Sequence, residues 1–431
     1  MSPATPSTDT QTPAIDCHYA NGQLALDGVA LEAIASAVGT PTYVYSRGLI
    51  EARWRAYDAA FGTRAHRVCY AVKANDNLSI LRSLGLLGAG FDIVSAGELA
   101  RVLASGAAAA DVIFSGVGKT AREIEYALTA GIGCLNVEST GEIECIAAVA
   151  GTLGRPAPIA VRVNPDIDAG THRYISTGLR ENKFGIPIED APALYRRIVS
   201  EKWLEARGVA CHIGSQLTSS APIIAAVQEV VALMEGLEAD GIELDHIDVG
   251  GGLGISYQDE RPPSIADLVA AVIEVVPERY TIVMEPGRSL VGEAGLLLTR
   301  VEYAKPAGSR NFVIVDAAMN DLLRPALYEA WHEVRPCAEA RLDEPGVLCD
   351  VVGPICESGD WLARARELAV QPGDLLAIMD TGAYGFAMAS NYNARPRPAE
   401  VLVYGGDFHV VRPRERTVDL FAREQEVLIE K

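Results

Sequence analysis

Residues 67–114 read RVCYAVKANDNLSILRSLGLLGAGFDIVSAGELARVLASGAAAADVIF, and this stretch decides the fold. It holds three short apolar runs, 67–72, 89–94 and 111–114, separated by segments with helix-like amphipathic spacing. Continuous apolar strands that alternate with helices indicate a parallel sheet covered on both faces. The same pattern continues to residue 288, with further apolar runs at 134–137, 159–163, 209–213, 246–249 and 280–284. About eight such units predict a closed (β/α)₈ barrel, and an open doubly wound sheet is the alternative.

After about residue 290 the sequence pattern changes, and turn-forming residues rather than helix-like segments separate the apolar runs. Strand-like segments there predict an antiparallel β domain; they are 297–303, 311–316, 347–352, 375–380 and 399–403. The predicted organisation is a disordered tail at 1–14, an N-terminal segment at 15–46 that joins the β domain, a barrel at 47–295 and a C-terminal β domain at 296–431.

Composition excludes several classes of function. The 431 residues carry 37 basic and 57 acidic side chains, a net charge of −20, which argues against nucleic-acid partners and anionic membranes. We expect no membrane span, because no run of about 18 apolar residues occurs. The tail lacks the basic and apolar regions of a signal peptide. The eight cysteines are irregularly spaced without a CxxC pair, which predicts a reducing, cytoplasmic location and no metal site.

Residues that follow the predicted strands meet at one end of a barrel, where active sites lie. Lys73 follows the first apolar run, and a desolvated lysine there has a lowered pKa and can form a Schiff base. A lysine that reaches solvent with its amine is the alternative. His212 lies at the end of the sixth run, where a purely structural histidine is the alternative.

Two further strand ends complete a set of side chains. The run DVGGGLG at 248–254 offers backbone N–H groups to a phosphate, although a tight turn is the alternative. Glu285 and Arg288 follow the eighth run and could pair with each other, or with a ring N–H and a substrate anion. An amine, a flat side chain, a phosphate cradle and a carboxylate together suit pyridoxal 5′-phosphate, whose ring nitrogen wants a charged partner.

Eight stretches of the sequence carry a family resemblance: YAVKAN (70–75), FDIVSAGEL (91–99), HRYISTGLRENKFGI (172–186), HIGSQ (212–216), DVGGGLGISY (248–257), EPGRSLVGEAG (285–295), CESGD (356–360) and GAYGFAM (382–388). Through them the chain resembles the diaminopimelate decarboxylases, in the alanine-racemase-like group of pyridoxal-phosphate enzymes. YAVKAN (70–75) and the glycine run are shared across the wider decarboxylase group. ISTGLRENKFGI (175–186) and CESGD (356–360) are narrower patterns and indicate the diaminopimelate branch.

The resemblance implies a barrel of the alanine racemase type and pyridoxal 5′-phosphate as the cofactor. It implies that Lys73 binds the cofactor as an imine, that His212 stacks on the pyridine ring, and that Glu285 pairs with the ring nitrogen. The residues implied to hold the phosphate, along with the Glu285 backbone, are Ser215, Gly252, Pro286, Gly287, Arg288 and Tyr384.

The implied reaction converts meso-2,6-diaminopimelate to L-lysine and CO₂, the last step of lysine biosynthesis, through a cofactor imine and a quinonoid. Glu357 is implied to bind the far ammonium of the substrate, and Cys356 to protonate the carbanion. Both reach across the interface of a homodimer into the partner's site. The residues implied to bind the substrate at its far carboxylate are Arg288, Arg324 and Tyr328, with Tyr384 beside them.

Rival functions stay open at this point. An ornithine, arginine or carboxynorspermidine-type decarboxylase is the nearest, and the resemblance implies Asp rather than Glu after Cys356 in the ornithine branch. A racemase is implied to place an arginine at the ring nitrogen, where this chain has Glu285. An inactive regulatory homologue would not need Lys73, His212 and Cys356. Whether residues 172–185 act as a lid is left open by the sequence.

Overall fold

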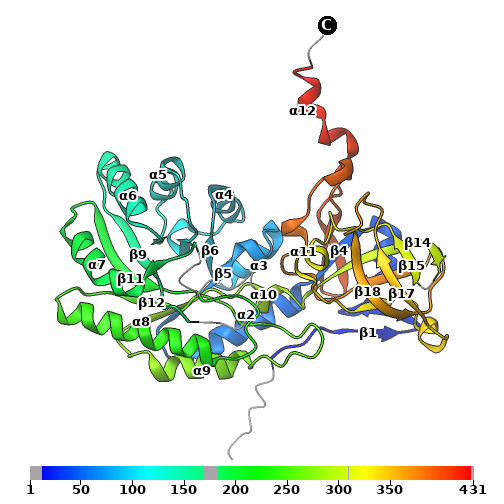
Figure 1. Cartoon of the computed structure of the whole chain (residues 1–431), viewed down its shortest axis with the longest axis horizontal. Helices are drawn as coiled ribbons and strands as arrows, with labels where there is room; N and C mark the ends of the chain where they lie inside the picture. The colour runs from blue at the N-terminus through cyan, green and yellow to red at the C-terminus, as the bar shows by residue number, and fades with distance from the viewer. Residues whose placement is uncertain (1–11, 168–182, 309, 429–431) are drawn as a thin grey trace, which may run out of the picture.

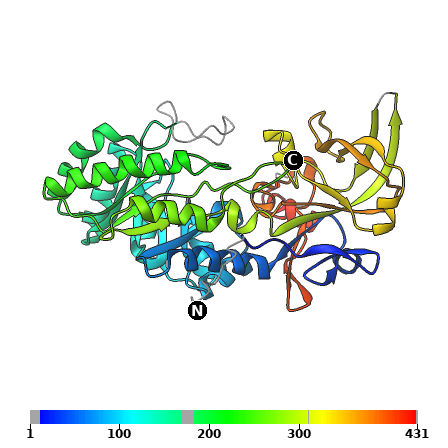
Figure 2. The same cartoon turned by 90° about the horizontal axis from the view of Figure 1, so that it is seen from below.

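The computed structural model describes residues 12–167, 183–308 and 310–428. Most of the expected tail, and most of the segment 172–185, therefore lie outside the described residues. The described chain forms two bodies that lie side by side in both views, a barrel in cyan and green and a β domain in yellow and orange (Figures 1 and 2). The first strands of the chain, in blue, lie with the β domain.

Eight parallel strands close into a barrel, which confirms the predicted fold. Each strand pairs with the next, and the last pairs back with the first, so the described barrel has no open edge. One further short strand, β10 (Ile186–Pro187), pairs with β9 outside the ring. The barrel strands are β5 (His66–Ala71), β6 (Gly90–Ile93), β7 (Val112–Phe114), β8 (Cys134–Val137), β9 (Ala157–Asn164), β11 (Leu204–Ala210), β12 (His246–Asp248) and β13 (Thr281–Met284).

Helices surround the barrel. They begin at local capping residues or turns and pack an apolar face against the strands. Ser95, Thr120 and Ser139 each accept a backbone N–H at the start of a helix, and such caps stabilise a helix by about 1 kcal/mol. In the described part of the chain, no helix combines the length and the apolar character needed to cross a bilayer. The helices are α2 (Arg47–Phe61), α3 (Leu78–Leu86), α4 (Ala96–Ala104), α5 (Ala121–Ala130), α6 (Thr140–Leu153), α7 (Ala191–Ser200), α8 (Ala221–Ala239), α9 (Ile265–Val275) and α10 (Arg288–Val291).

The second domain is a mostly antiparallel sheet, as predicted, with two parallel pairings that the sequence did not indicate. Strand β4 (Thr42–Ser46) lies between β14 and β20, antiparallel to the first and parallel to the second. Strands β15 and β17 also pair in parallel. The other strands are β14 (Gly295–Ala307), β15 (Arg310–Val315), β16 (Val334–Pro336), β17 (Val347–Val352), β18 (Trp361–Leu368), β19 (Leu375–Ile378), β20 (Ala399–Tyr404) and β21 (Asp407–Arg412).

Smaller elements accompany this domain, and α12 (Ala422–Gln425) projects away from it (Figure 1). Strands β1 (Cys17–Ala20), β2 (Gln23–Leu26) and β3 (Val29–Ala30) form a three-stranded sheet. The other helices are α1 (Leu31–Val38) and α11 (Arg324–Tyr328).

Hydrogen bonds join the β domain to the barrel beside the end of β5. The Tyr384 amide donates to the Ala74 carbonyl at 2.8 Å, and the Asn75 side chain donates to the Gly382 carbonyl at 3.1 Å. Asn77 donates to the buried carboxylate of Glu400 at 3.0 Å. The β domain thus fixes the loop that carries Lys73.

Candidate active site

Lys73 lies in a single 3₁₀ turn, Val72–Ala74, that follows β5 directly. Its Nζ is 2.5 Å from Oδ2 of Asp92 on β6, and the Asp92 side chain is fully buried. Burial lowers the pKa of Lys73, but the nearby carboxylates of Asp92 and Glu285 outweigh it, and the net shift is upward. The sequence-based expectation of a lowered pKa is therefore wrong, because it counted desolvation without this ion pair.

Two more buried carboxylates lie near this ion pair. Asp248 accepts the Gly250 amide at 2.9 Å and the Asn136 side chain at 3.0 Å. Glu285 Oε1 is buried and has no hydrogen-bond partner among the described residues. Burial, together with the charges of Asp248 and Asp92, raises the pKa of Glu285 well above its usual value, and burial raises the pKa of Asp248 to about 6.

The His212 ring is held by the glycine run that follows β12. Its Nδ1 accepts the Gly251 amide at 3.2 Å. Burial, then the charges of Arg162 and Lys73, lower the pKa of His212 well below its usual value, so the ring is neutral. Gly252 has φ +107°, and a Cβ there would lie 2.7 Å from the Gly214 carbonyl oxygen. The close approach of the two loops therefore requires glycine at this position.

The backbone at 285–288 offers fewer donors than the sequence suggested. The Glu285 amide already donates to the Gly250 carbonyl at 2.8 Å. Pro286 has no amide hydrogen. An anion at this loop would therefore meet the amides of Gly287 and Arg288, at the start of α10, rather than that of Glu285.

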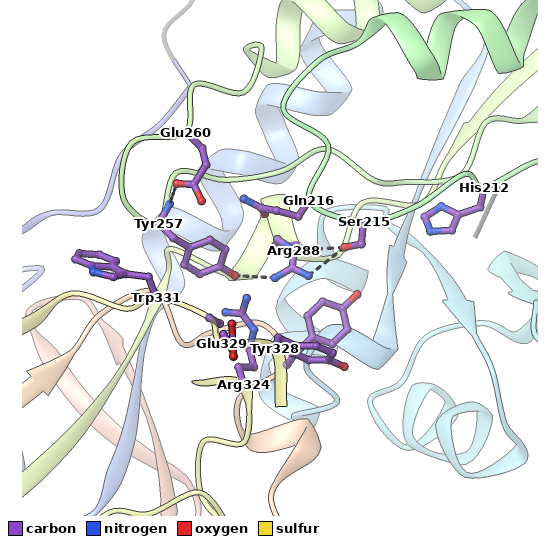
Figure 3. A pocket seen from close by; sticks show the side chains of 12 residues that line it. His212, Ser215, Gln216, Tyr257, Glu260, Arg288, Arg324, Tyr328, Glu329 and Trp331 are labelled. Carbon is purple, nitrogen blue, oxygen red and sulfur yellow. Dashed lines mark hydrogen bonds between the residues drawn. The ribbon is translucent and has the colours of Figure 1, made fainter. Parts of the chain in front are cut away.

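Two buried arginines line a cavity of about 440 Å³ between the barrel and the β domain. Figure 3 shows Arg288 donating to Ser215 Oγ, at 3.1 Å from Nη2, and to the Tyr257 hydroxyl, at 2.7 Å from Nη1. The Arg324 guanidinium lies over the Tyr257 ring, 4.4 Å from its centroid. Neither arginine forms an ion pair with a carboxylate of the described chain. Tyr328 and Tyr384 line the same cavity.

Lys73, His212 and Glu285 line a second cavity, of about 350 Å³, and His212 borders both cavities. The structure thus brings together the residues predicted at the strand ends and the two arginines. It does not bring Cys356 and Glu357 to them within one chain. Cys356 is exposed, its amide donates to Asn393 at 3.0 Å, and Glu357 accepts a hydrogen bond from the Tyr392 hydroxyl.

Four residues near the site were missed by sequence reasoning. Asp92 and Arg162 are charged residues inside otherwise apolar strands, a signal that could have identified both. Tyr257 lies at the end of the glycine-run stretch, but nothing in its spacing indicated a contact with the arginines. His332, which contacts Arg324, lies outside every quoted stretch, so only the tertiary structure identifies it.

The donor set fits pyridoxal 5′-phosphate. The buried, unsatisfied Glu285 oxygen suits a ring N–H, and the flat, neutral His212 side chain suits a ring face. The Lys73 amine suits the aldehyde, and Ser215 with the Gly287 and Arg288 amides suits a phosphate.

Comparison with known proteins gives the class first. Residues 47–292 match the family model described as pyridoxal-dependent decarboxylase, pyridoxal binding domain. Fold and site are thus those of a barrel-type pyridoxal-dependent decarboxylase.

Full-length relatives narrow this class. The chain is 54% identical to the diaminopimelate decarboxylase of Pseudomonas aeruginosa, over 94% of this chain and 98% of the relative. It superposes on the diaminopimelate decarboxylase of Helicobacter pylori complexed with L-lysine with a TM-score of 0.89 at 44% identity, covering 92% of this chain and all of that one. The chain belongs to the diaminopimelate decarboxylase family. A lysine/ornithine decarboxylase from Vibrio vulnificus shares only the fold, at 22% identity and a TM-score of 0.76.

Proposed function

We propose that this protein decarboxylates meso-2,6-diaminopimelate to L-lysine and CO₂ with pyridoxal 5′-phosphate as its cofactor. The substrate carries an ammonium and a carboxylate at each end, so one end reacts while the other must be recognised. The observation that carries the proposal is the pair of buried arginines, without a carboxylate partner in the described chain, in the cavity that adjoins Lys73 and Glu285. The names of the relatives agree with it.

At the reacting end the cofactor, when bound, supplies an electron sink for the carbon that loses CO₂. Lys73 would bind the cofactor aldehyde, and Asp92, 2.5 Å from Lys73 Nζ, is placed to take up or return the proton of that amine. The Glu285 carboxylate would pair with the ring nitrogen and keep a proton there, and the positive ring would oppose the rise in the pKa of Glu285 that burial and Asp248 cause. The neutral His212 ring contributes a face for stacking without adding a charge.

At the far end, Arg288 and Arg324 bind the carboxylate that is kept. A guanidinium without an internal carboxylate partner retains its charge for the substrate, and a bidentate pair with a carboxylate fixes direction as well as distance. Arg288 is oriented by Ser215 and Tyr257, and Arg324 by the Tyr257 ring. Tyr328 and Tyr384 close the cavity around this end.

The remaining roles require a second copy of the chain. Cys356 and Glu357 are exposed on the β domain, and Asn393 and Tyr392 hold this loop from the same chain. We assign the dimer two composite sites, in each of which the partner's loop brings a thiol to protonate the reacting carbon and a carboxylate to bind the far ammonium. Such an arrangement is an isologous two-fold dimer.

Mixed dimers test this assembly. Homodimers of Lys73→Ala and of Cys356→Ala are each expected to turn over poorly, because every site carries a lesion. Equal amounts allowed to exchange subunits form about half mixed dimers, each with one intact site of two, so activity recovers to about a quarter of wild type. Recovery should follow the rate of exchange measured by a mass tag, and complete exchange without recovery would contradict the composite site.

A substrate panel tests the reaction. CO₂ release is expected from meso-2,6-diaminopimelate and not from lysine or ornithine, and it should depend on added cofactor in the stripped enzyme. In Glu357→Gln, kcat/KM for diaminopimelate is expected to fall about 10-fold to 100-fold, since a hydrogen bond to a charged group is lost. Gln keeps the size of the side chain, so this variant is expected to fold like the wild type, and an unchanged fold is the control. Release from ornithine in preference to diaminopimelate would favour the rival decarboxylase.

We also place the protein in the cytoplasm. Its eight cysteines are all free, and Cys69, Cys134 and Cys211 are buried in or beside the barrel. Burial raises the pKa of each of these three thiols, which keeps them protonated and unreactive. Free thiols of this number fit a reducing compartment.

A further inference from the structure

A fully buried histidine contacts the arginine of the far end. His332 lies between α11 and β16, with none of its surface exposed. Its Nε2 is 3.1 Å from Arg324 Nη1, and its Nδ1 is 2.8 Å from the Met379 carbonyl oxygen. Neither contact belongs to the roles described so far.

The chemistry of these two contacts sets the state of the ring. A guanidinium only donates hydrogen bonds, so His332 Nε2 accepts from Arg324 and carries no hydrogen. The ring hydrogen is then on Nδ1, which donates to the Met379 carbonyl, and the ring is neutral. Burial, followed by the Arg324 charge, lowers the pKa of His332 well below its usual value, in agreement with this state. The other charged groups that act on the ring, Arg288 and Arg366, lower the pKa as well.

The backbone holds the ring in this place. After α11 the chain turns back through Glu329, whose φ is +53°. Strand β16 then pairs with β19, Val334 opposite Ile378, and the ladder continues with the Met379 amide donating to the Glu333 carbonyl at 2.9 Å. This register sets His332 beside the Met379 carbonyl, and the Tyr257 ring packs edge-on against it with 5.3 Å between centroids.

We infer that His332 is a positioning residue that aims Arg324 at the far carboxylate and leaves the charge of Arg324 for the substrate. The inference rests on the proposed function. A carboxylate in the place of His332 would orient the guanidinium equally well, but it would also neutralise it and compete with the substrate. A neutral acceptor engages one of five N–H donors and leaves the charge uncompensated. The Tyr257 ring fixes the plane of the guanidinium, and His332 fixes its rotation within that plane.

Two variants separate this role from a general packing role. Asn carries its amide near the position of Nδ1, so His332→Asn keeps the bond to Met379 and loses the acceptor for Arg324. Gln carries its amide near the position of Nε2, so His332→Gln keeps an acceptor for Arg324. Two competing ligands provide the readout: L-lysine has the far carboxylate, and cadaverine is the same chain without it. His246→Asn, in a histidine on β12 that lies outside both cavities, is the matched control.

Inhibition constants of both ligands against diaminopimelate turnover by the holoenzyme test the inference. His332→Asn is expected to weaken inhibition by lysine about 10-fold or more and to leave cadaverine within about 3-fold, with KM affected more than kcat. His332→Gln and His246→Asn should keep the wild-type preference for lysine.

Three results would overturn it. In the first, His332→Asn keeps the wild-type preference for lysine. In the second, it weakens lysine and cadaverine equally, which would indicate a packing role. In the third, which also serves if the Asn variant does not fold, His332→Gln folds but loses the preference. Equal inhibition of the wild type by both ligands is a different failure, because it contradicts the carboxylate contact of Arg324 in the proposed function and the inference with it.

Discussion

Replacing Lys73 with alanine is expected to lower turnover by at least about 10³-fold and to remove the visible absorbance of the holoenzyme. Lys73 is the amine at the strand end that faces Glu285 and His212, so covalent attachment of the cofactor is lost with it. The fully buried Asp92 also loses its partner, so the thermal midpoint of this variant should fall.

Lys73→Arg separates the two effects. Arginine keeps a positive charge beside Asp92 and preserves stability, but it does not bind the aldehyde, so activity and absorbance should be as low as in the alanine variant. Borohydride reduction of the wild type followed by peptide mapping should label Lys73. Labelling of Lys119 instead, a buried lysine that forms an ion pair with Glu142, would show the assignment to be wrong.

Replacing Glu285 with glutamine is expected to lower kcat by about 10²-fold to 10³-fold while the cofactor stays bound. A neutral amide no longer holds the proton at the ring nitrogen, so the electron sink weakens. Stability should not fall in parallel, because the substitution removes one of three carboxylates, with Asp92 and Asp248, that lie close together in the barrel.

Two measurements on this variant decide the assignment. The absorbance band should persist in Glu285→Gln, which distinguishes it from the Lys73 variants, and its thermal midpoint should equal or exceed that of wild type. Glu285→Asp retains the charge at a shorter reach and should have intermediate activity. A kcat for Glu285→Gln within about 3-fold of wild type would contradict the role.

The barrel and the residues at its strand ends could be predicted from the sequence. Parallel strands buried on both faces are continuous apolar runs, and their carboxyl ends meet at one face of a closed barrel. Lys73 and Glu285 directly follow such runs and His212 lies at the end of another, so the topology alone placed them together. The β domain was harder to predict, because partners such as β4 and β20 are far apart in sequence.

The charge states and orientations of the site residues could not be predicted from the sequence in the same way. The upward shift in the pKa of Lys73 depends on a carboxylate on the neighbouring strand, 2.5 Å away, and hydrophobic periodicity does not report which strand carries the partner. The sequence pattern at 356–360 indicated a family, but it did not indicate where this loop lies. The loop with Cys356 and Glu357 is on the β domain, apart from the Lys73 cavity of its own chain.

The sequence by itself determined the barrel, the strand-end residues and the family resemblance, because these depend on periodicity and on short contiguous stretches. Only the tertiary structure decided which groups share a proton, which arginines lack an internal partner, and that a neutral His332 orients Arg324. These properties depend on distances of about 3 Å between side chains from separate elements, where hydrogen bonds and buried charges are set. Such distances follow from the packing of neighbouring strands and loops within each domain, as for Lys73 with Asp92 and Arg324 with His332.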